Sequence, residues 1–190
     1  MTAGPPSGTV TFVFTDIEGS TALWQDHPQA MAAALARHDE IVRGAIERHH
    51  GYVFSTAGDA FAAAFRSATD AVAAISAAQV SLTGEPWNDA VIRVRAGLHT
   101  GEAEERGGDY FGPVLNRGAR IMALAGGRQV LLSQATAELV RDQLASGFDL
   151  HDVGEHRLKS LHRPEHLFQL MGPGLSDRAV EVASAEPSGN

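Results

Sequence analysis

Apolar residues in the first third of the chain follow two patterns, short continuous runs and longer stretches with helical spacing. The run Thr9–Thr15 (TVTFVFT) is β-branched and aromatic, which is typical of a strand buried on both faces. Residues Met31–His49 place apolar side chains at helical spacing and predict a long helix after that strand. Two short strands follow, Gly51–Ser55 and Ala60–Phe65, and the four residues between them suit a hairpin turn with Asp59 at its tip.

The later chain continues this alternation of helices and strands. Its middle predicts a helix, a strand and a second helix, at Ala68–Leu82, Val91–Leu98 and Gly112–Leu124. Its last part predicts a strand, a helix with a serine N-cap and two more strands, at Gln129–Leu132, after Ser133, and near Phe148–Val153 and His166–Leu170. The order βαββαβ, with further elements after it, is that of an α+β or α/β sandwich with helices over one sheet. We predict the α+β class, with a ferredoxin-like core sheet on which the helices pack.

Length and composition describe one globular domain. The chain has 190 residues, 44% of them hydrophobic, which is enough for one sizeable core and too few for a second full domain. Residues 1–8 are rich in Pro and Gly, and residues 173–190 in Pro, Gly and Ser, so we expect flexible ends around a folded domain at 9–172. No signal peptide and no apolar stretch of roughly 20 residues occurs, so we expect no membrane segment.

The charge of the chain limits its partners. A formal net charge of −8 disfavours nonspecific binding to nucleic acid or to an anionic membrane, because the summed field repels phosphates. A phosphate ligand would have to be held locally, by a metal ion or a few cations. The sequence has no cysteine, which excludes disulfides and thiolate metal sites and fits a reducing compartment. We expect a cytoplasmic protein that does not itself bind nucleic acid.

Two carboxylates are candidates for chemistry. Asp16 follows the first buried strand and Asp59 lies at the predicted hairpin tip, so the two come together if those strands pair. Two carboxylates, with water and substrate phosphates, are a usual way to bind Mg²⁺ in proteins. From residue type alone, the alternative that each aspartate only caps a turn or a helix is favoured.

Four motifs make a catalytic role of the two aspartates more plausible: FTDIEGST at 14–21, TAGDAF at 56–61, VRAGLHTG at 94–101 and DYFGPVLNRGAR at 109–120. In sequence and in order, they resemble motifs of the catalytic domain of class III adenylyl and guanylyl cyclases. The resemblance covers about Thr9 to Met171, and GEHRLKSL at 154–161 resembles a bacterial subgroup. It implies the class III cyclase homology fold and the formation of a cyclic 3′,5′-nucleotide and pyrophosphate from a nucleoside triphosphate.

The resemblance also implies the residues of the reaction. Asp16 and Asp59 match the two metal-binding aspartates, with the Ile17 carbonyl as a further ligand, and two divalent cations, Mg²⁺ or Mn²⁺, are expected. In the family, one ion activates the ribose 3′-hydroxyl and the other clamps the triphosphate. Asn116 and Arg120 match the pair that orients the ribose and stabilises the α-phosphoryl group, and their i,i+4 spacing puts both on one helix face.

Base recognition is where the sequence departs from the family. Asp109 matches the residue that accepts a hydrogen bond from the adenine amino group of adenylyl cyclases. Its partner position, a lysine in most adenylyl cyclases and a glutamate in guanylyl cyclases, holds Ser55. Serine lacks both the reach of lysine and the carboxylate that would read guanine, so base selectivity is weakened, and ATP is the expected substrate.

A further cation for the triphosphate comes, in this family, from the late β-hairpin. Arg157, Lys159 and Arg163 lie in that region, and Lys159 is our choice, with a solvated surface lysine as the alternative. The family also implies a head-to-tail homodimer, in which the metal aspartates of one subunit work with the base-reading and transition-state residues of the other.

Two rival functions and a rival metal site remain to be weighed. A regulatory pseudocyclase that binds nucleotide with little turnover is favoured by Ser55 and opposed by the four matching catalytic and metal residues. A palm-type diguanylate cyclase would require a GGDEF-like hairpin, which TAGDAF is not. Nine histidines occur without HExxH or similar spacing, so we interpret them as surface or packing residues, with His99 supporting the turn of its motif: His27, His38, His49, His50, His99, His151, His156, His162 and His166.

Overall fold

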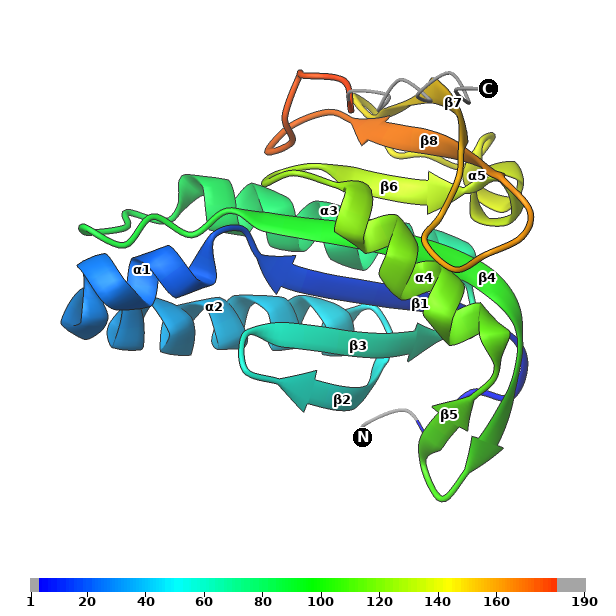
Figure 1. Ribbon diagram of the computed structural model, residues 1–190, viewed down its shortest axis with the longest axis horizontal. Coiled ribbons are helices and arrows are strands. Elements are labelled where there is room, and N and C mark those ends of the chain that lie inside the picture. Colours follow the sequence, from blue (N-terminus) through cyan, green and yellow to red (C-terminus); the bar gives the residue numbers. More distant parts are fainter. Residues whose placement is uncertain (1–3, 181–190) are drawn as a thin grey trace, which may run out of the picture.

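The structure, a computed structural model, describes residues 4–180, which form one mixed sheet with helices on both faces (Figure 1). The strands are β1 Gly8–Ile17, β2 Tyr52–Ala57, β3 Ala60–Phe65, β4 Val94–Arg106, β5 Asp109–Phe111, β6 Val130–Ser133, β7 Asp149–His156 and β8 Glu165–Met171. The helices are α1 Ser20–Asp26, α2 Pro28–Arg48, α3 Ala68–Gly84, α4 Pro113–Leu124 and α5 Gln134–Val140. The strand order is β2-β3-β1-β4-β6-β8-β7, and β5 pairs with β4 outside this path. The predicted α+β class, with helices packed on one sheet, is confirmed.

Strand β1 lies at the centre of the sheet and is buried on both faces, as its apolar run predicts. It pairs antiparallel with β3 on one side and with β4 on the other. Val13 faces a large core shared with α2 and α3, whereas Phe12 faces a smaller cluster with Tyr110 and Val114 on the opposite face. Figure 1 shows α4 in front of the sheet and α2 and α3 behind it. Successive side chains of β1 therefore contact the helix layers on the two opposite faces of the sheet.

Three elements differ from the sequence predictions, and one of them is the short strand β5, which was not predicted. Helix α1 was not predicted, because it has no buried residues and so no apolar period that could reveal it. Strand β4 runs on from Leu98 to Arg106, so VRAGLHTG lies inside a strand instead of ending in a turn. Glycine is required at position 97 of this strand, since a Cβ there would collide with the backbone of Met122 on α4. The glycine serves close packing of a helix on the strand.

Both ends of the described chain form hydrogen bonds with the domain, and the flexible ends expected from composition stay a prediction. The Tyr110 hydroxyl donates to the carbonyl of buried Pro6 at 2.6 Å. After β8, the Ser176 amide donates to Arg128, and the Gln169 side chain binds both the Arg178 carbonyl and the Val180 amide. Residues 173–180 therefore form a strap across the start of β6 and the end of β8. Residues 1–3 and 181–190 of the expected ends lie outside the described chain.

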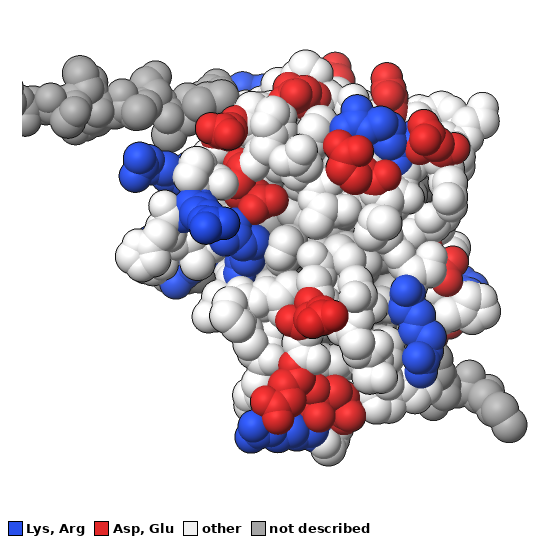
Figure 2. Space-filling view, turned by 90° about the vertical axis from the view of Figure 1, so that its right-hand side faces the viewer, with Lys and Arg blue, Asp and Glu red and all other residues white. Residues whose placement is uncertain are grey.

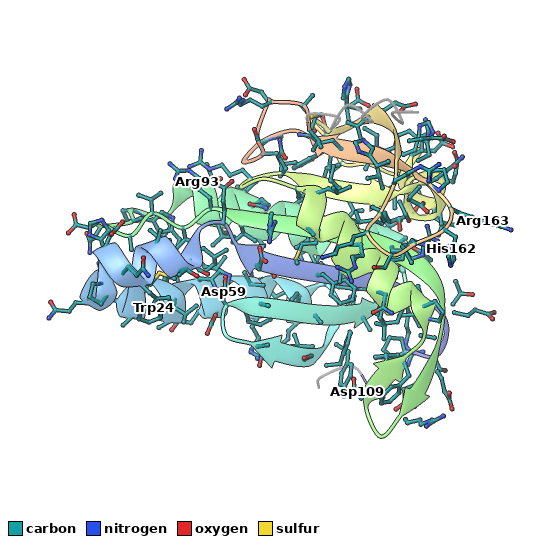
Figure 3. The ribbon with its side chains drawn as sticks, in the orientation of Figure 1. Trp24, Asp59, Arg93, Asp109, His162 and Arg163 are labelled. Atoms are coloured by element: carbon teal, nitrogen blue, oxygen red, sulfur yellow. The ribbon has the colours of Figure 1, made fainter. Side chains whose placement is uncertain are left out.

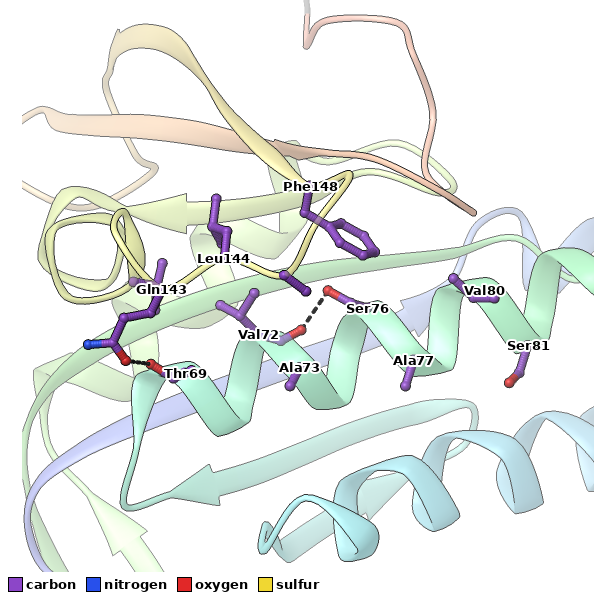
Figure 4. A pocket seen from close by; sticks show the side chains of 12 residues that line it. Thr69, Val72, Ala73, Ser76, Ala77, Val80, Ser81, Gln143, Leu144 and Phe148 are labelled. Carbon is purple, nitrogen blue, oxygen red and sulfur yellow. Dashed lines mark hydrogen bonds between the residues drawn. The ribbon is translucent and has the colours of Figure 1, made fainter.

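A hollow of about 610 Å³ lies between α3 and the α5–β7 connection, on the helix face of the sheet that α4 does not cover (Figure 4). Val72, Leu144 and Phe148 line it. A hydrogen bond of 3.0 Å from the Thr69 hydroxyl to the Gln143 side chain closes one end. No helix within residues 4–180 combines the length and the apolar character that crossing a membrane requires.

Candidate active site

The two candidate metal aspartates meet at one end of the central strands. Antiparallel pairing of β1 with β3 brings the end of β1 beside the β2–β3 turn, where Gly58 has a φ of 60° that favours glycine in a two-residue hairpin turn. The Asp59 carboxylate accepts a hydrogen bond of 2.7 Å from the Ile17 amide, next in sequence to Asp16. The sequence prediction that Asp59 lies at a hairpin tip and close to Asp16 is confirmed.

Arg95 was missed by sequence reasoning and lies directly opposite Asp16 in the β1–β4 pairing. Its Nε lies 2.5 Å from Asp16 Oδ1 and its Nη2 lies 2.8 Å from Oδ2, a two-pronged ion pair. The hydrogen bond to Asp16 is the main reason that the pKa of Arg95 is raised above its ordinary value. The sequence contains Arg95 within a family motif, but only the strand register shows which carboxylate it meets.

The donor set around Asp16 fits a magnesium-type ion. Asp16 and Asp59 supply two carboxylates, and Ile17 supplies a carbonyl between them in sequence. Within residues 4–180, no group of three or more His, Cys, Asp or Glu side chains could hold a metal by itself. Mg²⁺ commonly takes one or two carboxylates and fills its other positions with water and substrate oxygens, so two carboxylates are a sufficient protein contribution.

Helix α4 carries the second group of candidates, Asn116 and Arg120. Asn116 is exposed and Arg120 is half-buried, one turn apart on the same helix face. Neither side chain makes a hydrogen bond to another group in the described part of the chain. The helix itself is fixed: a Cβ on Gly118 would collide with the Phe14 ring, and Arg117 forms an ion pair of 2.6 Å with Glu165. A rigid helix therefore presents two polar side chains without partners.

The base-recognition candidates lie on two strands that pack against each other. Asp109 opens β5 and Ser55 lies on β2, and both are exposed. Their sequence neighbours Tyr110 and Phe54 pack with ring centroids 4.9 Å apart, which joins the two strands.

Asp109 and Asp59 lie toward opposite ends of β2 (Figure 3). The Tyr52 hydroxyl, at the start of β2, donates to the Gly108 carbonyl at 3.0 Å, whereas Asp59 follows the end of that strand. The six residues of β2 span about 20 Å at about 3.3 Å per residue. One chain thus keeps Asp59 apart from Asp109, whereas Ser55 lies between them on β2.

Lys159 lies in the connection between β7 and β8, which crosses over α4 in Figure 1. Leu158 anchors this connection, because it is 3% exposed and packs in a cluster with Ile121 of α4. Lys159 is exposed and forms no ion pair within residues 4–180. Figure 3 shows Arg163 and His162 of the same connection beside α4 and far from Asp59. The structure does not bring Lys159 to the aspartates of its own chain.

His99 lies in the middle of β4 and not in a turn, although its supporting role has a clear basis. Its Nδ1 lies 2.7 Å from the Ser133 hydroxyl, which also caps α5 as predicted. Buried hydroxyls continue this contact from Ser133 through Thr136 and Thr100 to Thr11 on β1. Burial, with a smaller contribution from Arg117, lowers the pKa of His99 to about 4. His99 is therefore neutral at physiological pH and ties β4 to β6.

Surface charge is divided into small groups on the face turned toward the viewer in Figure 2. Acidic and basic side chains lie side by side at the lowest part of this face. In the β4–β5 hairpin, Arg106 forms an ion pair with Glu104. Basic side chains elsewhere on this face form separate groups and no continuous stripe. This face lacks the extended basic surface that nonspecific nucleic-acid binding requires.

Comparisons with known proteins agree with this geometry. The family described as "Adenylate and Guanylate cyclase catalytic domain" matches residues 3–172. An uncharacterized protein of Mycobacterium tuberculosis is 44% identical over 97% of the chain, which spans 63% of the length of that relative. The adenylate cyclase of Neurospora crassa is 32% identical over 93% of the chain and 10% of its own length.

Solved structures of the same architecture are similar. An adenylate cyclase from Trypanosoma brucei, solved in its monomeric state, superposes with a TM-score of 0.82 at 28% identity, covering 95% of this chain and 97% of its own. The adenylyl cyclase CyaB of Pseudomonas aeruginosa superposes with a TM-score of 0.67 at 22% identity, covering 91% of this chain and 96% of its own. The second likeness bears on the fold alone.

Proposed function

The chain belongs to the family of adenylate and guanylate cyclase catalytic domains, and on this premise we propose that it forms cyclic 3′,5′-AMP and pyrophosphate from ATP as a homodimer. The observation that carries the proposal is the meeting of Asp16, Ile17 and Asp59 at the β1 end, fixed by the 2.7 Å hydrogen bond between Asp59 and the Ile17 amide.

Asp16, Ile17 and Asp59 would hold two divalent cations, Mg²⁺ or Mn²⁺. When bound, these ions lower the pKa of the ribose 3′-hydroxyl and neutralise the triphosphate. The chain's own residues do the rest: Asn116 orients the ribose, and Arg120 stabilises negative charge on the α-phosphoryl group as the 3′-oxygen attacks in line and pyrophosphate leaves. Both side chains lack partners within the described domain, which leaves their donors available for a nucleotide.

The separation of Asp109 from Asp59 along β2 supports a site assembled from two chains. In a head-to-tail dimer, the metal end of one subunit would face Asp109, Asn116 and Arg120 of the other, which forms two equivalent sites. Each site would then contain every required group. Lys159, exposed above α4, is our candidate for a contact with the triphosphate.

ATP is the proposed substrate because Asp109 is a hydrogen-bond acceptor suited to the adenine amino group. Guanine presents a carbonyl at that position, and two acceptors would face each other. Ser55 supplies only a short hydroxyl where a lysine would reach the base. We therefore propose an adenylate cyclase of modest activity and imperfect base selectivity.

A catalytically weak regulatory domain is the second candidate, favoured by Ser55 and by the engagement of Asp16 with Arg95. One assay separates the two: purified protein is incubated with ATP or GTP, each with Mg²⁺ or Mn²⁺, and cyclic product is measured by chromatography. The Asp59→Asn variant is the matched control. Product from wild type and none from Asp59→Asn supports the cyclase, whereas nucleotide binding without product from either supports the regulatory domain.

A further inference from the structure

Arg95 holds Asp16 with a geometry that leaves it little freedom. All three guanidinium nitrogens are engaged: Nε and Nη2 with the two Asp16 oxygens, and Nη1 with the Ala123 carbonyl of α4 at 3.3 Å. The Arg95 and Asp16 side chains are 29% and 20% exposed, so water screens the pair only in part. Cross-strand pairing of the two residues fixes their backbones as well.

The guanidinium occupies the position of a cation among carboxylates. Asp16, Glu18 and Asp59 all act on Arg95 electrostatically. A divalent ion would need the same Asp16 oxygens at about 2.0–2.2 Å, together with Asp59. Ion and guanidinium therefore compete for the same acceptors, and their like charges repel each other at this short range.

We propose that Arg95 is a built-in counter-ion that competes with a metal ion for Asp16, so that metal binding requires the guanidinium to turn away. This inference rests on the proposed function in one respect, the assignment of Asp16 and Asp59 as metal ligands. It adds a gate to that site: metal entry requires the loss of a charge-assisted, two-pronged ion pair. By the usual strength of such hydrogen bonds, the pair weakens metal binding by about tenfold to hundredfold.

If Arg95 instead supported the metal site, its loss would change the metal affinity in the opposite direction. A carboxylate has about four lone-pair sites, so an arginine could orient Asp16 while leaving lone pairs for the ion. Loss of Arg95 would then weaken metal binding. The shared use of both oxygens and the net repulsion of two cations favour the gate, and the direction of one measured change separates the two roles.

The test uses Mn²⁺ and the nucleotide-free full chain, with free Mn²⁺ followed by electron paramagnetic resonance. Arg95→Met removes the charge and keeps an apolar stem. Arg93→Met is the matched control, since Arg93 is exposed, lies two residues earlier and forms no ion pair within residues 4–180. We expect Arg95→Met to bind Mn²⁺ about tenfold to hundredfold tighter than wild type, and Arg93→Met to stay within about threefold.

Two further variants test the role of Arg95 independently. Arg95→Lys retains the charge without the two-pronged geometry, so it should bind Mn²⁺ with intermediate affinity, and it serves if Arg95→Met does not fold. Mn²⁺ binding by Arg95→Met that is equal to or weaker than that of Arg93→Met overturns the gate alone. The double variant Asp16→Asn with Arg95→Met should lose the increase in Mn²⁺ affinity that Arg95→Met shows. If it does not, the ion binds elsewhere, and the metal-ligand assignment under the proposed function fails together with the gate.

Discussion

Two regions of the molecule carry candidate catalytic groups. They differ in whether these groups already have hydrogen-bond partners within the single chain. In the metal region (Asp16, Ile17, Asp59 and Arg95), the polar side chains are paired with one another or with backbone. In the α4–β5 region (Asp109, Asn116 and Arg120), Asn116 and Arg120 have no hydrogen-bond partner within residues 4–180. The difference has a physical cause. Pairing of β1 with its neighbours places hydrogen-bond partners beside the side chains of the first region, whereas Asn116 and Arg120 project from a helix surface that offers them no partner.

This contrast indicates what each region requires. The metal region must exchange an internal partner for an ion, which makes its function depend on the strength of existing bonds. The α4–β5 region must gain partners from outside, which a nucleotide and a second subunit would supply. Substitutions in the metal region should therefore affect metal binding within one chain, and substitutions in the α4–β5 region should be rescued across chains.

The largest effect is expected from the loss of a metal carboxylate. Asp16→Ala or Asp59→Ala should reduce cyclic nucleotide formation by about a thousandfold or more, since each ion contributes several kcal/mol to stabilisation of the transition state. The fold should survive, because each side chain lies at a strand end or a turn and outside the core. Product formation is measured by chromatography, and circular dichroism checks the fold. A folded variant with wild-type turnover would contradict the two-metal assignment.

The second effect is a rescue between chains. Asp16→Ala and Arg120→Ala should each be inactive, and their mixture should regain roughly a quarter of wild-type activity. Half of the randomly exchanged dimers are mixed, and each mixed dimer has one intact site out of two. Activity is measured after subunit exchange has been verified with two affinity tags. A mixture that exchanges subunits and stays inactive would show that the site is not shared between chains.

Sequence reasoning located the elements that local patterns define. A buried β-branched run predicted β1, Ser133 predicted a helix start, and a glycine before Asp59 predicted the hairpin tip, all of which the structure confirms. It could not find Arg95 opposite Asp16 or Arg117 beside Glu165, because both pairs depend on tertiary register. The strap at 173–180 was missed for a related reason: backbone groups and Gln169 hold it, and its composition is that of a linker.

A third prediction tests base choice, which we assign to Ser55 of β2 and to Asp109 of the α4–β5 region. Ser55→Lys should raise kcat/KM for ATP relative to GTP by a few-fold to roughly a hundredfold, because it adds a hydrogen bond that a buried base otherwise lacks. Wild type should prefer ATP modestly. The two specificity constants of both proteins decide the matter, with Thr56→Lys, a neighbouring exposed position on β2, as control. A wild-type preference for GTP would overturn the proposed role of Asp109.

The smallest effect concerns the support beneath α4. Burial lowers the pKa of His99 to about 4, below its ordinary value of 6.5, and burial also lowers the pKa of His38. The unfolded chain therefore takes up protons first as the pH falls. The contribution of each neutral histidine is complete above about pH 6.5, and that of His99 is lost progressively from there to about pH 4.

Replacing His99 should remove part of this pH dependence. His99→Gln keeps a hydrogen-bonding side chain that cannot titrate, so its free energy of unfolding should fall less between pH 6.5 and pH 4 than that of wild type, by about 1–3 kcal/mol. Urea unfolding across this range measures the change, and His162→Gln, at an exposed position, should behave like wild type. A parallel decline in wild type and His99→Gln would mean that His99 does not tie β4 to β6 through its neutral form.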